Sequence, residues 1–285
     1  LKLTGEGKAM RPAPFDLLQP QTLEEALQAL AAGATPLAGG QSLLQSMRLG
    51  LSRPDKVVDE LCLDTLGAQI ERHGTLIEVG AKVTHQQLAD NDLLAQYCPW
   101  LCVAAKSIGD VQVRNLGTTL GNVCWADPRA NMAIAMLASG AQLKVFRNAA
   151  NPATESLSLD DVFVGFRQTA LDGRLAHSLQ VPVDSGAEGC YLEFSRQPQD
   201  LAVVSVCVVK GDHGVRIALG GVAPTPLRNR QLEEMAVSLG DVSDIAEILH
   251  QDTRCIPPAD SVGSRDYKLH VAAELTLRAL QSLND

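Results

Sequence analysis

The 285-residue sequence predicts an α+β protein of two domains. Helical and strand patterns are mixed along the first part of the chain. Val181–Gly186 then combines Pro, Asp, Ser and Gly, a composition typical of a linker. Beyond it, consecutive strand patterns precede consecutive helical patterns, which favours a separate α+β domain. We therefore expect one domain over residues 10–185 and a second over residues 186–285.

A capping box marks the first predicted helix. The Thr22 hydroxyl and the Glu25 carboxylate can each accept a hydrogen bond from a free backbone N–H at a helix start. Gly33 marks the end of this helix. Its apolar side chains recur at helical spacing: Leu23, Ala26, Leu27 and Leu30. A short strand follows, and further strands are expected at Pro54–Asp59 and Thr75–Val79.

A second capping box, Thr84 with Gln87, opens a predicted helix that runs through Leu94. Further helices are predicted at 99–108 and at 132–138, and Gly140 marks the end of the second one. A strand is predicted at 142–146, and a stretch rich in turns follows at 148–186. The second domain is expected to contain strands at 191–195, 202–210 and 214–219, followed by helices at 233–239, 242–250 and 266–283.

The charge balance argues against nucleic-acid or membrane partners. The net charge is -9, and Lys and Arg do not cluster. The longest largely apolar run, Leu201–Val209, is far shorter than the about 20 residues that span a bilayer. We recognise no secretory signal. Residues 1–9, which precede Met10, are expected to be a tag remnant or a disordered arm.

The seven cysteines are an odd number and are scattered along the chain. This pattern favours reduced thiols in a cytoplasmic protein over a disulfide framework. Cys98 and Cys102 are separated by three residues, and Cys124 follows further on. A metal or iron–sulfur site would normally show tighter pairs and a complete ligand set. We therefore expect buried thiols and no metal site.

Two glycine-containing segments, Pro36–Leu44 and Arg114–Asn122, carry the main functional signal and are predicted to be loops. Glycines let backbone N–H groups approach an anion closely, and Ser or Thr hydroxyls add donors. Two such loops suggest a pyrophosphate held from both sides, as in a bound dinucleotide. Leu43 and Leu44 could pack under a ring, while polar groups for a sugar-like chain are Asp127 and Asn131. The alternative is two ordinary turns.

The chain offers no recognisable catalytic machinery. No Gly-x-Gly-x-x-Gly segment of the dinucleotide-binding type and no Walker loop is present. The six histidines show neither paired spacing nor a neighbouring carboxylate, and each is expected to be a surface or capping residue. No nucleophile elbow or carboxylate pair is visible. Any chemistry would therefore belong to the cofactor.

Motifs along the chain match one protein family from Arg11 to Leu283: residues 12–16, 20–26, 37–44, 117–128, 194–196, 220–226 and 263–270. They resemble the medium, FAD-binding subunit of the molybdenum hydroxylases. This family includes bacterial carbon monoxide dehydrogenase, quinoline and nicotinate dehydrogenases, and the flavin domain of xanthine dehydrogenase.

The resemblance implies a vanillyl-alcohol-oxidase-like, PCMH-type FAD-binding domain of two α/β lobes. A small α+β domain like the C-terminal domain of carbon monoxide dehydrogenase flavoproteins would follow. FAD is the implied cofactor, and the two glycine segments would wrap its pyrophosphate. The implied cofactor-binding residues are Leu37, Ala38, Gly39, Gly40, Gln41, Ser42, Leu43, Leu44, Ile108, Gly117, Thr118, Thr119, Leu120, Gly121, Asn122, Asp127, Asn131 and Leu175.

The resemblance also implies partner subunits. A small subunit with two [2Fe-2S] clusters would feed electrons to the FAD, and a large molybdopterin subunit would oxidise the substrate. The complex would be a dimer of such heterotrimers. The FAD would then reduce NAD, dioxygen, a quinone or another acceptor. Neither the substrate nor the acceptor follows from this sequence, because substrate selection takes place in another polypeptide.

The chain departs from the family pattern at positions expected near the FAD. Leu120 stands where a glycine is usual, and its Cβ would penalise a positive φ. Asn131 replaces an acidic residue, and Glu193 stands where a Lys is common. These changes leave open a cofactor-poor structural or regulatory subunit with lost or weak FAD binding. A self-contained flavin oxidase or reductase, a third alternative, would need its own acid or base.

Overall fold

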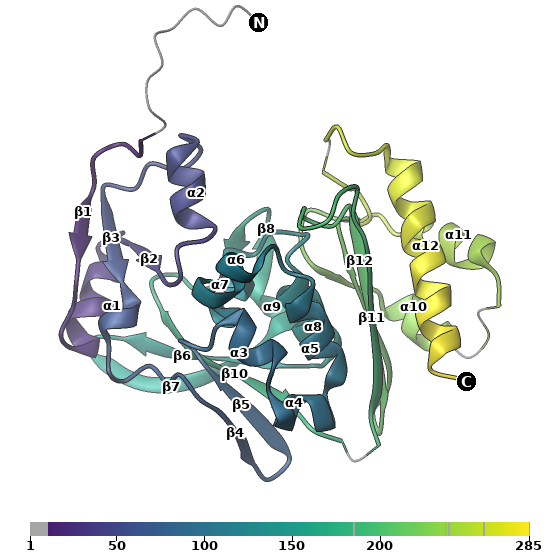
Figure 1. Ribbon diagram of the computed structural model, residues 1–285, viewed down its shortest axis with the longest axis horizontal. Helices are drawn as coiled ribbons and strands as arrows, with labels where there is room; N and C mark the ends of the chain where they lie inside the picture. The colour runs from purple at the N-terminus through teal and green to yellow at the C-terminus, as the bar shows by residue number, and fades with distance from the viewer. Residues whose placement is uncertain (1–10, 185, 237, 239, 259, 285) are drawn as a thin grey trace, which may run out of the picture.

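The computed structural model describes residues 11–184, 186–236, 238, 240–258 and 260–284 (Figure 1). Four sheets and twelve α-helices make up this part of the chain. The segment 1–9, for which a tag remnant or disordered arm is expected, lies outside the described residues.

A small parallel sheet begins the described chain. Its strands lie in the order β1 (Asp16–Leu18), β3 (Lys56–Asp59) and β2 (Thr35–Leu37). Helix α1 (Leu23–Ala31) joins β1 to β2, helix α2 (Leu43–Arg48) follows β2, and the 3-10 turn η1 (Glu60–Cys62) follows β3. Because Leu37 is paired with Asp59 in parallel register, the loop after β2 and the turn η1 leave the same edge of the sheet.

A five-stranded antiparallel sheet follows. Its strand order is β4 (Ile70–His73), β5 (Leu76–Gly80), β10 (Leu175–Pro182), β6 (Gln142–Asn148) and β7 (Asn151–Ser158). A short helix α9 (Leu159–Val162) and a two-stranded pair, β8 (Phe163–Gly165) and β9 (Gln168–Thr169), connect β7 to β10.

A group of short helices lies between this sheet and the next (Figure 1). They are α3 (His85–Ala89), α4 (Asp92–Tyr97), α5 (Pro99–Lys106), α6 (Val111–Leu116), α7 (Thr119–Trp125) and α8 (Asn131–Ala138). Every residue of α8 is buried. A helix that is apolar all round must have packing partners on all sides, and α8 contacts α5, α7 and the four-stranded sheet described next.

The last sheet is an antiparallel meander of four strands: β11 (Glu188–Phe194), β12 (Val204–Gly211), β13 (Gly214–Gly220) and β14 (Leu227–Arg228). Its outer face is covered by α10 (Arg230–Met235) and α12 (Arg265–Ser282), and α11 (Val242–Gln251) packs against α12 (Figure 1). Strand β12 is buried on both faces. Cys207 and Val209 join the core around α5 and α8, whereas Val206 and Val208 join the core under α12.

The helix starts predicted at Thr22 and Thr84 are confirmed, and two other helix predictions are wrong. The side chains of Thr22 and Thr84 accept from the backbone N–H groups of Glu25 and Gln87. The helix predicted through Leu94 is wrong, because it ends at Ala89 and a new helix begins at Asp92. The side chain of Asn91 accepts from the backbone N–H of Leu94, so this residue caps a second helix and does not continue the first. The helix expected at 233–239 is α10, which begins at Arg230 because the Asn229 side chain caps it.

The stretch at 148–186, expected to be rich in turns, is largely strand. Edge strand β7 is mostly exposed, which explains its polar sequence. Strand β10 is the central strand of its sheet, although polar residues interrupt its apolar ones. The proposed linker Val181–Gly186 begins inside β10, and Ser185 lies outside the described residues. The short elements β1, β4, β14 and α2 were not predicted.

Candidate cofactor-binding site

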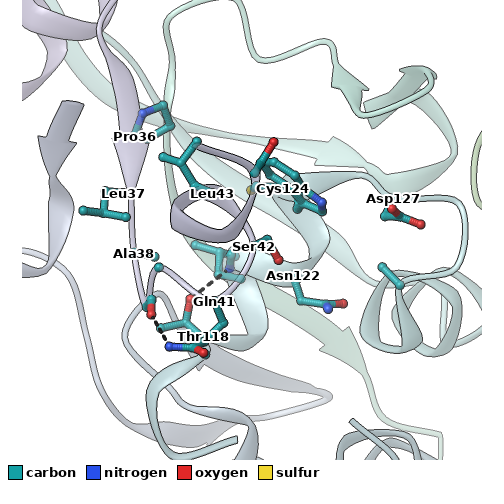
Figure 2. Close-up of a pocket in the computed structure, with 18 of the residues that line it drawn as sticks. Pro36, Leu37, Ala38, Gln41, Ser42, Leu43, Thr118, Asn122, Cys124 and Asp127 are labelled. Atoms are coloured by element: carbon teal, nitrogen blue, oxygen red, sulfur yellow. Dashed lines mark hydrogen bonds between the residues drawn. The ribbon is translucent and has the colours of Figure 1, made fainter. Parts of the chain in front are cut away.

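One cavity of about 760 Å³ lies where the parallel sheet, the short helices and the segment around β9 and β10 meet. Its volume falls within the range typical of pockets for cofactors and other small molecules. Figure 2 shows side chains from the segment after β2 and from helix α7 facing this space. Both glycine segments singled out in the sequence therefore border the same cavity.

The two segments touch each other where glycine is required. A Cβ on Gly39 would come within 1.9 Å of the backbone oxygen of Leu116, so only a residue without a side chain fits. The next residue, Gly40, has a φ of +72°, which favours glycine for a second, conformational reason. The close backbone contact brings the segment after β2 against the end of helix α6.

The first segment presents unused hydrogen-bond donors. Among the hydrogen bonds of the described residues, none is donated by the backbone N–H groups of residues 39–42. The side chain of Gln41 turns back, and its Nε2 donates to the backbone oxygen of Gly39 at 3.2 Å. A run of free N–H groups around a positive-φ glycine is an anion-binding arrangement. This geometry fits the oxygens of a pyrophosphate.

The second segment is not the loop that was predicted. Residues 114–116 end helix α6, Gly117 links the helices, and Thr119–Trp125 form helix α7. Thr118 caps α7, since its Oγ1 accepts from the backbone N–H of Gly121 at 3.0 Å. Leu120 is helical and buried. Its Cβ therefore meets none of the positive-φ strain expected from the sequence.

Short contacts tie this second segment to the start of helix α3. The backbone N–H of Thr119 donates to the oxygen of Val83, and that of His85 donates to the oxygen of Gly117. His85 lines the cavity and is only 3% exposed, so its expected surface or capping role is wrong. Burial and the nearby Arg114 lower the pKa of His85 to about 4, which makes the ring neutral at physiological pH.

Most residues predicted to bind the cofactor line this one cavity. They are Leu37, Ala38, Gly39, Gly40, Gln41, Ser42, Leu43, Ile108, Gly117, Thr118, Leu120, Gly121, Asn122, Asp127, Asn131 and Leu175. Two others do not line it. Leu44 packs against the small core around Leu43 and Met47, and Thr119 is fully buried with its Oγ1 unpartnered.

An ion pair in the cavity wall was missed by the sequence analysis. Arg167 donates from Nε and Nη2 to Oδ2 of Asp127, at 3.0 and 2.8 Å. Its guanidinium also lies 5.2 Å from the ring centroid of Trp125, within the range of a cation–π contact. Asp127 and Arg167 are forty positions apart in the sequence, and no local pattern signals that they meet.

Backbone strain is concentrated at the same site. Four non-glycine residues in the described chain have a positive φ: Ala126, Arg167, Asp172 and Gln199. Three of them line the cavity, and Ala126 lies between two lining residues. Such conformations cost of order 1–3 kcal/mol each and are retained where the surrounding structure over-determines them, often at functional sites.

A hydrogen-bonded pair lies beside the cavity, which Asn131 lines. Nδ2 of Asn131, at the start of α8, donates to Oε2 of Glu193 at 2.7 Å. The hydroxyl of Tyr191 donates to the same oxygen at 2.9 Å. Burial raises the pKa of the Glu193 carboxyl. The amide and the carboxyl are thus a matched pair that joins α8 to β11.

The structure gives no sign of a metal centre in the part of the chain it describes. No three His, Cys, Asp or Glu side chains are grouped so that they could hold a metal ion. All seven cysteines are free thiols. Burial raises the pKa of Cys98 to about 12, so its thiol is protonated at neutral pH. None of the described helices combines the length and apolarity needed to cross a bilayer.

Comparison with known families divides the chain into two matches. Residues 13–184 match the family model described as the FAD binding domain in molybdopterin dehydrogenase. Residues 189–283 match the model described as the CO dehydrogenase flavoprotein C-terminal domain. Together these two matches cover nearly the whole described chain.

Individual proteins agree with the family matches. The glyceraldehyde dehydrogenase medium chain of Sulfolobus acidocaldarius is 30% identical over 286 residues, covering 96% of this chain and 100% of the relative. Among solved structures, reconstituted CO dehydrogenase from Oligotropha carboxidovorans has a TM-score of 0.85 at 27% identity. Quinoline 2-oxidoreductase from Pseudomonas putida 86 has a TM-score of 0.82 at 27% identity. Each alignment covers 95% of this chain and 97% of the solved chain. The chain therefore belongs to the family of FAD-binding medium subunits of molybdenum-containing dehydrogenases.

Proposed function

We propose that this chain holds one FAD in the cavity and relays electrons from a [2Fe-2S] partner subunit to a final acceptor. The single observation that carries this proposal is the row of free backbone N–H groups at residues 39–42, in a segment that lines the cavity that helix α7 also borders. The final acceptor would be NAD, dioxygen, a quinone or another acceptor. Substrate oxidation would take place in another subunit.

The residues fit a dinucleotide in two ways. Gly39 lets the two glycine segments pack against each other, Gly40 supplies a positive-φ turn, and the unpartnered N–H groups of this segment suit phosphate oxygens. The apolar side chains of Ile108 and Leu175 border the same cavity and suit an aromatic ring system. We propose that all the cavity-lining residues predicted from the sequence contact the FAD. Leu44 and Thr119 would support it from behind.

The flavin, when bound, can accept and release electrons singly or in pairs. The protein groups around it would bind and orient it and keep water away. Asp127 would hold Arg167 against Trp125 at the cavity wall, and the Thr118 hydroxyl would fix the start of α7. These residues are suited to positioning, and none is assigned a catalytic role.

We further propose an assembly with a small [2Fe-2S] subunit and a large molybdopterin subunit, as a dimer of heterotrimers in the cytoplasm. The names of the relatives support a multi-subunit complex, because they are medium chains or complex subunits. The free cysteines support a reducing compartment. The division into a FAD-binding domain at 10–185 and a C-terminal domain at 186–285 is part of this proposal.

A substitution at Gly39 tests the proposed binding mode. In Gly39→Ala, the new Cβ overlaps the Leu116 oxygen and must push the two segments apart. We expect FAD affinity to fall at least about tenfold, the equivalent of about 1.4 kcal/mol. The measurement is an equilibrium titration with FAD, followed by flavin fluorescence.

Gly240→Ala is the matched control. Nothing lies within 4 Å of a Cβ at Gly240, and its φ is not positive, so FAD affinity should not change. Equal affinity in Gly39→Ala and the unmodified chain would contradict the assignment of this segment. No binding by the unmodified chain would instead favour a cofactor-poor subunit.

A further inference from the structure

A buried carboxyl group borders the cavity beside the first glycine segment. Glu60 is the first residue of η1, directly after β3, and is 6% exposed. Leu37 and Asp59 are the last paired residues of the parallel strands β2 and β3. The residues that follow them, Ala38 and Glu60, therefore leave the sheet at the same end. Glu60 therefore lies at the sheet edge from which the segment with free N–H groups departs, and it lines the same cavity.

This carboxyl group has no partner within the described residues. It takes part in no hydrogen bond or ion pair there. The two arginines of the cavity wall are already paired, Arg167 with Asp127 and Arg174 with Glu155. A carboxyl group that is buried, unpaired and adjacent to a cavity is costly to keep unless a ligand or proton satisfies it.

The surroundings of Glu60 favour its protonated form. Burial is the main cause and the neighbouring Asp59 adds to it, so that the pKa of Glu60 is raised to about 7. The thiol of Cys124, on α7, also lies close, and its pKa is raised by burial and by Glu60. His85, the histidine in the cavity wall, has a pKa of about 4 and stays neutral above pH 6.

We propose that Glu60 is a FAD-contacting residue that donates a hydrogen bond, as a neutral carboxylic acid, to an oxygen of the phosphate or ribityl part of the cofactor. This inference rests on the proposed function. The free N–H groups of residues 39–42 direct the anionic part of the ligand to the edge where Glu60 lies. An ionised Glu60 would repel that part, whereas the protonated group has a donor to offer.

Binding of FAD is therefore coupled to a proton. Below the pKa of free Glu60 the donor is already in place, and affinity is at its maximum. Above it, the carboxylate must take up a proton as FAD binds, so affinity falls as pH rises. For one coupled proton the loss approaches about tenfold per pH unit.

The test is FAD titration of the full chain, by flavin fluorescence, at about pH 6 and about pH 8.5, where a single group of pKa about 7 predicts about thirtyfold weaker binding at the higher pH. Calorimetry in two buffers with different ionisation heats should show uptake of nearly one proton at the higher pH. Both readouts measure binding and need no assay of the assembled complex.

Glu60→Gln separates this inference from its alternatives. The amide keeps the size of the side chain and donates at every pH, so its affinity should be nearly the same at both pH values and close to that of the unmodified chain at low pH. Glu71→Gln, at an exposed glutamate of β4 outside the cavity, should keep the original pH dependence.

Three results would overturn the inference. Equal FAD affinity of the unmodified chain at both pH values would contradict the role of Glu60 and would leave the proposed function unaffected. A pH dependence that persists in Glu60→Gln would assign the proton to another group. No FAD binding by the unmodified chain at either pH would overturn the proposed function and the inference together.

Discussion

Hydrogen bonds between single side chains join the elements that surround the cavity. The pair of Asn131 and Glu193 shows this most clearly, since a donor amide faces a half-buried carboxyl group at 2.7 Å. Each of the two side chains satisfies the hydrogen-bonding group of the other. The hydroxyl of Tyr191 completes the arrangement from β11. A substitution at one of these two positions therefore removes the hydrogen-bond partner of the other.

Asn131→Asp tests this complementarity. Two carboxyl groups would then face each other at hydrogen-bond distance, and we expect the free energy of unfolding to fall by about 1–3 kcal/mol. The loss should be larger at pH 8 than at pH 5, because a shared proton relieves the repulsion. Urea unfolding at both pH values is the measurement.

The double variant Asn131→Asp with Glu193→Gln is the control for this prediction, because it restores one donor amide and one carboxyl group. Its stability should return to near that of the unmodified chain. A double variant as unstable as Asn131→Asp would show that the two residues are not coupled.

A capped helix start holds the second glycine segment in place. Thr118 caps α7 directly in the cavity wall, and Asn91 caps α4 away from it. The two caps have the same geometry, since each side-chain oxygen accepts from a backbone N–H three residues on, at 3.0 Å. Substituting each cap therefore separates the effect of a lost cap on protein stability from its effect on FAD binding.

We expect Thr118→Ala and Asn91→Ala to cost similar stability, about 1 kcal/mol each, because each removes one N-cap hydrogen bond. Only Thr118→Ala should weaken FAD binding, since α7 carries the second segment. Thermal unfolding and FAD titration of both variants check this. Comparable loss of FAD affinity in Asn91→Ala would contradict the assignment.

Elements that follow local rules could be predicted from the sequence. Thr22 and Thr84 predict the starts of their helices, because an N-cap hydrogen bond joins residues only three positions apart. The central strand β10 could not be placed, since its partners β5 and β6 lie far away in the sequence. Arg167 could not be predicted as a site residue either, because its partner Asp127 is also distant in the sequence. Glu60 reaches the cavity only through the parallel register of β2 and β3.

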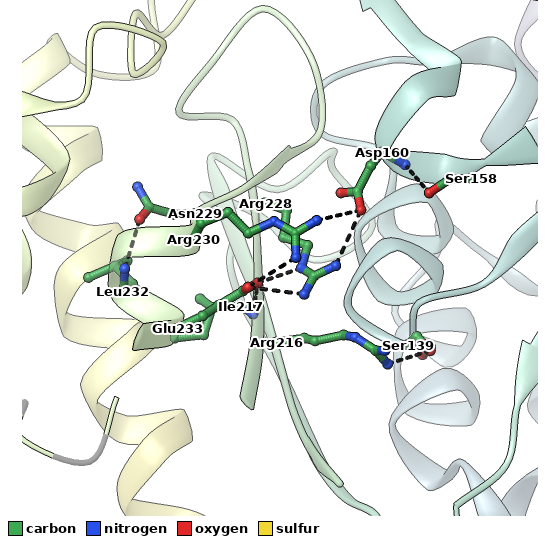
Figure 3. A network of polar contacts seen from close by, with 10 residues as sticks. All are labelled: Ser139, Ser158, Asp160, Arg216, Ile217, Arg228, Asn229, Arg230, Leu232 and Glu233. Carbon is green, nitrogen blue, oxygen red and sulfur yellow. Dashed lines mark hydrogen bonds and ion pairs between the residues drawn. The ribbon is translucent and has the colours of Figure 1, made fainter. Parts of the chain in front are cut away.

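At the scale of the molecule, a polar network joins the two halves of the chain. Arg228, on β14, pairs with Glu233 of α10 and with Asp160 of α9, and Arg230 reaches the same Asp160 (Figure 3). The backbone N–H of Ile217 also donates to the Glu233 carboxylate. The Glu233 side chain is only 8% exposed, so these partners take the place of water around its carboxylate.

Arg228→Met should therefore destabilise the protein strongly. It leaves the buried Glu233 carboxylate with two partners, the backbone N–H of Ile217 and the Arg230 guanidinium at 3.6 Å. Loss of one partner of a buried pair costs about 3–5 kcal/mol. Arg278→Met removes an exposed pair with Glu274 on α12 and should cost at most about 0.5 kcal/mol. Urea unfolding compares them, and equal losses would show that the network contributes no more than a surface pair.

The most direct test of the central claim is an absorbance spectrum of the purified chain before and after incubation with FAD and desalting. We predict that the chain retains oxidised flavin, with its characteristic visible absorbance, and that the colour bleaches on reduction. A colourless chain that retains no flavin after incubation would contradict the claim that this cavity is a FAD site in the isolated subunit.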